Sequence, residues 1–419
     1  MFLAAAVTLA LTNNPSVLTA KERLAEASAQ ASSSYSQLFP TILAVSDASY
    51  KKDSLIMGNA LFGGEPYNVY GIGFEAVQPI FRGGATWSAI TLAQKEYDIR
   101  ALELKIVENQ LTVGVIDLFY KILLAQHRLD IMLGTEKSQK ESLALMEQRL
   151  RIGRDQDITV LQQRTQVALL KPKILEAQHG LRVAASELAT MLGTRDQSDI
   201  EITGSLAVPA LKTLGQTLEN QQHKQASSRF EIQRMQLMKD RFQNERSVTL
   251  SKHWPQLDAI AGIDNNATEK TRLFDVDGRS WVVGFRLTIP LFSGLSSIFE
   301  RRVFSARSGL LEADDAKLKD QIALEQVNAE RTLEYSHSLL DAAEESVNHA
   351  RAAANSAHRN LKFNTGTHSE FFEANRNLLE AQLTLTQARY EVIVGTARYA
   401  AAFNISLQEV VAALDVQRQ

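Results

Sequence analysis

The longest unbroken pattern in the chain is helical. Between Gly84 and Arg151 there is no proline, and glycine occurs only at 114 and 134. Apolar side chains recur there every three or four positions, as in a coiled-coil seam. They are Ile99, Leu102, Ile106, Val113, Ile116, Tyr120 and Leu123, with Asn109 as the polar exception. At about 1.5 Å per residue such a helix would reach roughly 100 Å. A second stretch of this kind spans 296–362.

The order of patterns in the first half of the chain recurs in the second half. Residues 78–83, Gln-Pro-Ile-Phe-Arg-Gly, match residues 289–294, Ile-Pro-Leu-Phe-Ser-Gly, with residue numbers that differ by 211. Residues 38–40, Leu-Phe-Pro, match residues 253–255, His-Trp-Pro. Each half therefore predicts a helix, a strand pair, a Pro-apolar-Phe-x-Gly junction, a very long helix, a glycine turn and a returning helix.

The two returning helices carry a heptad of large and small residues. In the second half the large residues are Phe371, Leu378, Leu385, Val392 and Tyr399, and the small residues three positions later are Ala374, Ala381, Ala388, Gly395 and Ala402. A shift by 211 gives Val160, Val167, Ile174, Leu181 and Leu188 in the first half. Such a stripe fits either a bundle within one chain or a wall against neighbouring helices. Because compact bundles rarely need helices of nearly seventy residues, we favour the wall.

Before each junction the hydrophobic period changes to two, which indicates half-buried strands. In the second half one face carries Trp281, Val283, Phe285, Leu287 and Ile289, opposite Leu257, Ala259, Ala261 and Ile263. In the first half, strands at 40–50 and 67–77 place Tyr70, Ile72, Phe74 and Ala76 on the apolar face. Strands of this length with one apolar face suit a transmembrane barrel wall, which four strands cannot close without identical chains. The alternative is a small soluble sheet that caps a helical bundle.

Composition and charge narrow the function further. The net charge of -3, with 45 basic and 48 acidic residues, provides no basic stripe for nucleic acid. The absence of cysteine excludes disulfides and thiolate sites. No apolar run is long enough for a membrane-spanning helix. The apolar segment 1–11 lacks the positively charged residues with which a secretory signal begins. We therefore expect that the export signal is missing or truncated in this sequence. The alternative is a cytosolic protein with an apolar first helix.

Catalytic motifs are absent from the sequence. HExxH, GxSxG and the phosphate-binding loop do not occur, and the eight histidines have no metal-ligand spacing. These histidines are at 127, 179, 223, 253, 337, 349, 358 and 368. We therefore expect neither an enzyme nor a cofactor or metal site.

The duplicated order resembles the TolC-type outer-membrane efflux proteins over nearly the entire chain. Residues 9–17, Leu-Ala-Leu-Thr-Asn-Asn-Pro-Ser-Val, look like the opening signature of that family, and residues 79–84 and 290–294 look like its two strand-to-helix junctions. The resemblance implies a mainly α protein with a β-barrel part: a homotrimer with an α-helical barrel in the periplasm and a 12-strand barrel in the outer membrane.

The resemblance also implies a function and its partners. The chain would be a passive exit duct that works with a periplasmic adaptor (membrane fusion) protein and an inner-membrane pump of the RND, ABC or MFS type. Drug efflux, metal efflux and protein secretion remain open, because the pump chooses the cargo. The alternative function is a soluble or envelope-attached coiled-coil scaffold.

The duplication predicts the domain limits. Residues 1–192 form the first structural repeat, 193–210 an equatorial linker, 211–405 the second repeat and 406–419 a C-terminal tail.

The two glycine turns are the predicted functional tips, because the resemblance places the closed end of the duct there. Matching Gly153 with Gly366 makes the second turn two residues shorter, and Thr159 replaces the usual tip acid. The candidate pore and gating residues are Glu370, Glu373, Asp157, Asp155, Arg154 and His368; the candidate adaptor contacts are Arg151, Gly153, Thr365, Gly366 and Thr367.

A ring of tip carboxylates would attract cations and form a pH-sensitive constriction. The alternative is that Glu370 and Glu373 are solvated first-turn acids favoured by the helix dipole. Arg154 and His368 would form links between the tips that hold the mouth of the duct shut. The alternative is that both are ordinary surface residues.

Overall fold

The structure is a computed structural model that describes residues 1–52, 54–57, 60–63, 66–153, 156–194, 202–208, 229–269, 279–363 and 365–415. Its contacts form two compact units. Unit 1 contains residues 1–22, 102–233 and 316–419, and unit 2 contains residues 23–101 and 234–315. Each unit takes residues from both predicted repeats, and the four-part domain division remains a prediction.

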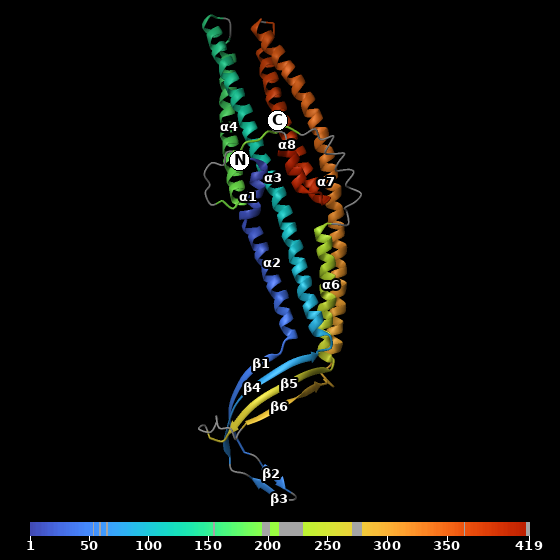
Figure 1. The fold of residues 1–419 in the computed structure, drawn as a ribbon. Coiled ribbons are helices and arrows are strands. Elements are labelled where there is room, and N and C mark those ends of the chain that lie inside the picture. Colours follow the sequence, from blue (N-terminus) through green and yellow to red (C-terminus); the bar gives the residue numbers. More distant parts are fainter. Residues whose placement is uncertain are drawn as a thin grey trace. The chain divides into compact units, whose positions relative to one another are not determined.

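The helices confirm the duplication (Figure 1). They are α1 (Leu3–Asn13), α2 (Pro15–Ser34), α3 (Ala85–Arg151), α4 (Asp157–Met191), α6 (Phe230–Leu250), α7 (Ser296–Lys362), α8 (His368–Ala402) and α9 (Leu407–Asp415). The long helices α3 and α7 both have 67 residues, and the returning helices α4 and α8 both have 35. Both pairs are related by the predicted shift of 211. In the predicted second repeat, residues 211–228 lie outside the described part.

The predicted shortening of the second tip is wrong. The segment between α3 and α4 covers 152–156, and the segment between α7 and α8 covers 363–367, so both have five residues. The error came from matching Gly153 with Gly366, because the helix ends place Gly153 opposite position 364 instead. By the same correspondence Thr159 matches Glu370, and Asp157 matches His368.

Unit 2 contains a four-stranded antiparallel sheet in the order β1-β4-β5-β6. The strands are β1 (Thr41–Lys51), β4 (Tyr67–Phe81), β5 (Gln256–Ala267) and β6 (Arg279–Thr288). A second antiparallel pair, β2 (Ser54–Met57) with β3 (Ala60–Gly63), was not predicted. The β4–β5 register shifts between Pro79 and Phe81, where the proline has no N–H for the ladder.

The two faces of the four-stranded sheet differ as the period of two predicts. Register aligns Phe74 with Ile263, and Ile263 with Trp281, so the apolar positions of three strands share one face. Phe285 on the same face is 75% exposed. The opposite face carries the charged residues Asp47, Glu75, Asp258, Asp264 and Arg286. Among the described strands, β1 and β6 are each paired along one edge only.

The main core of unit 1 joins the ends of the chain to the middle of α3. Phe119, Ile116 and Leu123 of α3 lie in one cluster with Leu3 of α1 and Val410 of α9. The amide of Ala4 also donates to the Asp415 carboxylate at 3.0 Å, so a polar contact joins α1 to α9. None of the described helices has both the length and the hydropathy of a membrane span.

The heptad stripe of α8 packs inside the chain. Ala388, Val392 and Ala402 are almost fully buried, and a side chain at Gly395 would lie 3.7 Å from Leu333 and Ser336 of α7. The helices that bury this stripe are therefore helices of the same chain. The periodicity predicted burial correctly but could not identify the partner.

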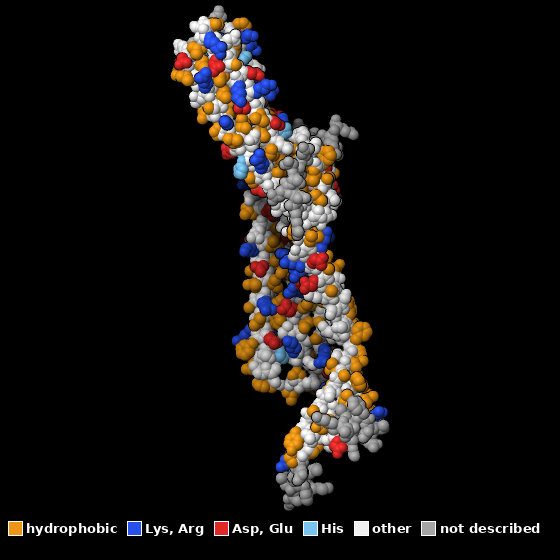
Figure 2. Space-filling view, turned by 90° about the vertical axis from the view of Figure 1, so that its left-hand side faces the viewer, with side chains coloured by type: hydrophobic (Ala, Val, Ile, Leu, Met, Phe, Trp, Pro, Cys, Tyr) orange, Lys and Arg blue, Asp and Glu red, His pale blue; other side chains and the backbone are white. Residues whose placement is uncertain are grey.

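Helix α4 has one buried and one exposed apolar side. Val160, Leu170, Ile174 and Leu188 are buried. Ile158, Leu161, Leu169 and Leu175 are 47–57% exposed. Figure 2 views the molecule from the side that carries α4 in Figure 1, and hydrophobic side chains are visible there among Lys and Arg side chains.

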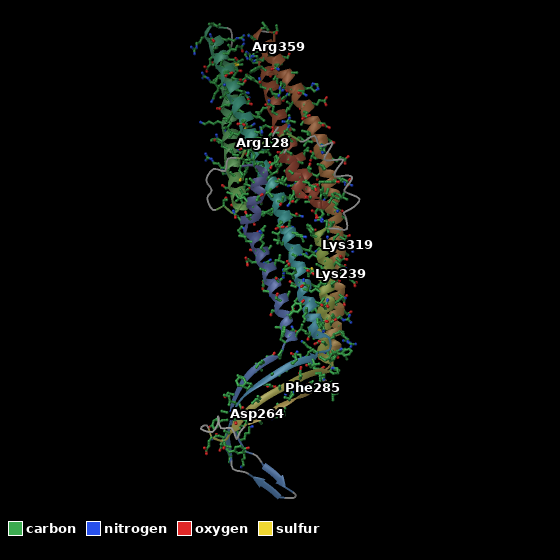
Figure 3. All side chains as sticks on the ribbon, in the orientation of Figure 1. Arg128, Lys239, Asp264, Phe285, Lys319 and Arg359 are labelled. Atoms are coloured by element: carbon green, nitrogen blue, oxygen red, sulfur yellow. The ribbon has the colours of Figure 1, made fainter. Side chains whose placement is uncertain are left out.

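Polar contacts join the two helix pairs of unit 1. The Tyr390 hydroxyl of α8 donates to the Asp117 carboxylate of α3 at 2.5 Å, and the Arg398 guanidinium lies 3.5 Å from the same carboxylate. Further toward the tips, Arg128 (labelled in Figure 3) donates to the Gln387 side-chain oxygen at 3.0 Å. Burial and the Asp117 hydrogen bond raise the pKa of Tyr390 well above its ordinary value. The hydroxyl therefore keeps its proton at neutral pH.

Replacement of Tyr390 by Phe should lower the free energy of unfolding by about 1–3 kcal/mol, because the part-buried Asp117 carboxylate loses its nearest donor. Thermal unfolding in detergent measures the loss. Asp117→Asn combined with Tyr390→Phe should cost less than the sum of the two single variants. Tyr335→Phe is the control, since Tyr335 is 61% exposed. A loss no larger than that of the control, with additive effects, would contradict the assignment.

Candidate functional site: the helix tips

The first tip is a glycine turn between exposed charges. The amide of Gly153 donates to the Leu150 carbonyl at 2.9 Å, and Gly153 has a φ of +69°, a conformation that suits glycine at a helix end. Arg151 lies in the last turn of α3, and Asp157 lies in the first turn of α4. Each charge therefore interacts favourably with the dipole of its own helix. Both side chains are exposed. The predicted residues Arg154 and Asp155 lie outside the described residues.

The second tip is fixed by a capping box. The Thr367 hydroxyl accepts from the Glu370 amide at 3.2 Å, and the Glu370 carboxylate accepts from the Thr367 amide at 3.1 Å. The Thr365 amide donates to the Asn360 carbonyl at 2.9 Å. Gly366 has no room for a side chain, because a Cβ there would lie 2.8 Å from the Asn360 Cβ. The turn therefore brings Thr365, Gly366, Thr367 and Glu370 together.

The predicted acids and histidine at this tip have different surroundings. Glu370 caps the first turn of α8, which agrees with the alternative that it is a first-turn acid favoured by the helix dipole. Its side chain is also exposed, so it remains accessible to ions. Glu373 is also exposed. The His368 ring lies 6.4 Å from the Phe372 ring of its own helix, measured between centroids. Their roles in a pore remain predictions.

Just behind the tips, an apolar cluster joins the two hairpins. Met146 of α3, Val160 of α4 and Phe371 of α8 are buried together, and Leu361 of α7 packs against them. The Arg149 guanidinium of α3 also donates to the Leu361 carbonyl at 3.3 Å, near the negative end of the α7 dipole. We had not assigned these residues to the site. The heptad pattern contained the signal, since Val160 and Phe371 are the first large residues of the two series.

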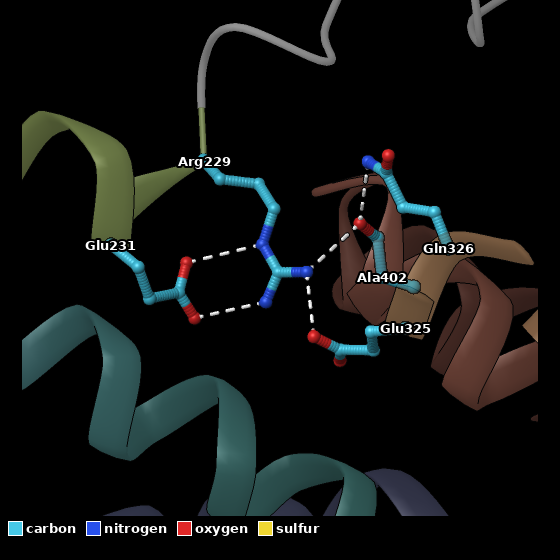
Figure 4. A network of polar contacts seen from close by, with 5 residues as sticks. All are labelled: Arg229, Glu231, Glu325, Gln326 and Ala402. Carbon is cyan, nitrogen blue, oxygen red and sulfur yellow. Dashed lines mark hydrogen bonds and ion pairs between the residues drawn. The ribbon is translucent and has the colours of Figure 1, made fainter. Parts of the chain in front are cut away.

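A second unassigned feature is the ion network of Arg229, which lies deeper in unit 1 (Figure 4). The guanidinium donates to Glu231 through two nitrogens, to Glu325 of α7 at 2.9 Å and to the Ala402 carbonyl of α8 at 3.3 Å. Burial lowers the pKa of Arg229, but the hydrogen bonds and charges of the two glutamates outweigh it and leave the pKa raised. The network fixes the start of α6 to α7 and α8.

A cavity of about 760 Å³ adjoins this network. Its lining mixes apolar side chains such as Ile106 and Ile322 with the polar side chains of Asn109, Asn328 and Arg398. Across the described residues, no group of three or more His, Cys, Asp or Glu side chains is arranged to hold a metal ion. The chemistry here is that of packing and ion pairing.

Comparisons of sequence support the resemblance. Residues 6–194 match the model of the family described as outer membrane efflux protein. The cobalt-zinc-cadmium resistance protein CzcC of Cupriavidus metallidurans is 25% identical over 325 residues, 74% of this chain and 70% of CzcC. The proteases secretion protein PrtF of Dickeya chrysanthemi is 23% identical over 296 residues, 67% of this chain and 62% of PrtF.

Solved structures share the fold over nearly the entire chain. CusC superposes with a TM-score of 0.82 at 17% identity, covering 96% of this chain and 92% of CusC. The outer membrane protein VceC of Vibrio cholerae also gives 0.82 at 17% identity, with 96% of both chains covered. The outer-membrane channel OprN gives 0.80 at 20% identity, covering 97% of this chain and 90% of OprN.

These findings agree with the observed geometry of long duplicated helices and a two-faced four-stranded sheet. They confirm the predicted fold class, as one protomer, and the outer-membrane location. They also confirm a transport function without catalysis. Residues 6–194 of this chain match the outer membrane efflux protein family, and nearly the entire chain has the fold of the TolC-type outer-membrane channels CusC, VceC and OprN.

Proposed function

We propose that this chain is one of three identical subunits of the outer-membrane exit duct in a tripartite export system. A periplasmic adaptor and an inner-membrane pump of the RND, ABC or MFS type would complete the system. The duct is passive, so the pump supplies both the energy and the choice of cargo. The helix tips form its periplasmic entrance.

The sheet of unit 2 is the observation that carries this proposal. Its apolar face leaves Phe74, Trp281 and Phe285 exposed, as a lipid-facing surface requires. Its opposite face carries charged side chains, among them Asp264, labelled with Phe285 in Figure 3. In the part of the chain that the structure describes, the outer edges of β1 and β6 remain open, and lipid does not tolerate open edges. Further copies of the same sheet would close them into a ring.

The cargo follows from the pump rather than from this chain. Of the two relatives, one is named for cobalt-zinc-cadmium resistance and the other for secretion of proteases. Similar ducts therefore serve chemically unrelated cargo. We propose that small molecules, metal ions or a secreted protein pass through the same kind of channel here.

The exposed acids at the second tip support a selective entrance. Glu370 and Glu373 lie in the first turns of α8, and neither side chain is buried. Three copies around a narrow mouth would place six carboxylates there, which would attract cations and repel anions. Arg151, Gly153 and the segment from Thr365 to Thr367 are the exposed or turn residues that an adaptor would contact.

Phe285→Arg should abolish recovery in the outer membrane, because a cation on the lipid-facing side of a barrel costs about 2–4 kcal/mol at mid-bilayer. Gly284→Arg on the opposite face is the matched control, since a side chain there meets nothing within 4 Å. Membrane fractionation and immunoblotting measure both variants. Equal recovery of the two would contradict the assignment of the faces.

Glu370→Gln combined with Glu373→Gln should reduce the preference for cations over anions, because charge is lost at the entrance. The capping geometry is retained, since the side-chain oxygen of a glutamine at position 370 still accepts from the Thr367 amide. Reversal potentials of purified channels in a planar bilayer under a salt gradient measure this preference. Glu380→Gln, an exposed acid farther along α8, is the control. An unchanged reversal potential would remove both tip acids from the filter.

A further inference from the structure

The second strand-to-helix junction, residues 289–302 of unit 2, is far more exposed than the first. Leu291 and Phe292 are 93% and 80% exposed. The corresponding residues of the first junction, Ile80 and Phe81, are 54% and 47% exposed. The two junctions therefore have different surroundings, although their sequences correspond position by position.

A contact within unit 2 holds the first junction against β5. The Arg82 guanidinium lies 2.8 Å from the carboxylate of Asp258. The second junction has Ser293 at the position of Arg82, and a serine cannot form this ion pair. The Ser293 hydroxyl instead lies 3.2 Å from the His253 ring, whose other nitrogen lies 3.1 Å from the Glu300 carboxylate of α7. The second junction thus remains attached to unit 2 but leaves its apolar side chains exposed.

Leu295 in this junction has a backbone conformation that leucine rarely adopts. Its φ is +62°, in the left-handed region, and the corresponding residue of the first junction is Gly84, with a φ of +83°. A glycine at 295 would avoid the clash of the Cβ atom with the backbone. The leucine instead provides an apolar side chain that is 53% exposed. A strained residue whose side chain is half exposed indicates a contact outside its own chain.

Basic side chains follow the exposed apolar ones at the start of α7. Arg301 and Arg302 are exposed, where the first repeat has Ile90 and Thr91. Arg302 comes three positions after Phe299, which is 56% exposed, so both lie on one side of α7. The two arginines are about 8–9 Å along the axis from the first residue of α7. Because the Cα–Cβ bonds of a helix tilt toward its N-terminus, both side chains lean toward the junction.

Apolar side chains followed by cations at this distance fit the border of a lipid bilayer. Aromatic side chains are enriched where the hydrocarbon core meets the headgroups, and long basic side chains extend into the headgroup layer. That layer is roughly 5–8 Å thick on each side of the bilayer. The exposed apolar face of β6, which we propose to face lipid, also leads through Leu287 and Ile289 to Leu291. If Leu291 contacts acyl chains, the arginines are level with the lipid phosphates.

We propose that the second junction is a binding site for anionic phospholipids of the bilayer. Leu291, Phe292 and Leu295 contact the acyl chains, and Arg301 and Arg302 bind the phosphates. The first junction does not share this role, because it has no cations at the two corresponding positions. This inference rests on the proposed function, since it requires the sheet of unit 2 to lie in the outer membrane.

Spin labelling shows what covers the junction, because the chain contains no cysteine and each label has one site. A nitroxide on Leu291→Cys in liposomes should be relaxed by oxygen, which concentrates in lipid, and hardly by a water-soluble nickel chelate. Leu310→Cys, at an exposed leucine farther along α7, is the control and should not prefer oxygen. Exclusion of both relaxants at 291 would indicate a protein cover such as a second copy, and preference for nickel would indicate water. Either result would overturn the lipid contact.

Lipid retention tests the two charges. Protein extracted in mild detergent from vesicles of phosphatidylethanolamine and phosphatidylglycerol should retain phosphatidylglycerol above its share in the vesicles. Arg301→Gln with Arg302→Gln should remove this enrichment, because one cation at a membrane surface contributes about a fivefold preference. Arg351→Gln with Arg359→Gln, two exposed arginines nearer the tip of α7, is the matched control and should keep it. No enrichment in the unaltered protein, or the same enrichment in all three proteins, would overturn the phosphate site.

A failure of this lipid site is distinguishable from a failure of the proposed function. If the label at 291 reports protein or water while the protein conducts ions in a planar bilayer, the lipid site is overturned and the channel stands. If the unaltered protein is absent from the outer membrane and forms no conducting pore, the proposed function fails and the lipid site fails with it.

Discussion

The constraint on which the structure depends is that neither unit is complete within one chain. Among the described residues, the sheet of unit 2 ends in two strands whose outer edges have no ladder partner, and the large side chains of its most apolar face are exposed. In lipid, unpaired backbone groups cost several kcal/mol each. Helix α4 of unit 1 likewise leaves Leu169 and Leu175 about half exposed. The ring of identical chains that we propose would cover both kinds of surface.

Duplication explains how one sequence can supply such an open wall. The long helices α3 and α7 have equal lengths, and so do the returning helices α4 and α8. In both pairs the first and the last residues differ by the same 211 positions. The repeats also differ at individual positions. Leu169 of α4 corresponds to Glu380 of α8, and Thr159 corresponds to Glu370, which caps its helix. These differences support the proposal that the second repeat supplies the tip acids of the entrance.

The sequence predicted those features that periodicity encodes. The period of two placed Trp281 and Phe285 on the exposed apolar face, and the long runs without proline gave α3 and α7 nearly to the residue. Periodicity says which side of a helix is buried but not against what, so the α8 heptad did not identify α7 as its partner. The contact of Tyr390 with Asp117 could not be predicted, because a polar pair 273 positions apart resembles any solvent-exposed helix surface. The length of the second tip was predicted wrongly, because the two tips were aligned on their glycines rather than on the ends of their helices.

Single-channel recording of the purified protein in a planar bilayer tests the central claim most directly. The account predicts discrete conductance steps from an oligomer whose mass, determined by light scattering with the detergent subtracted, is three times that of one chain. A protein that remains a single chain in detergent and leaves the bilayer resistance unchanged would contradict it.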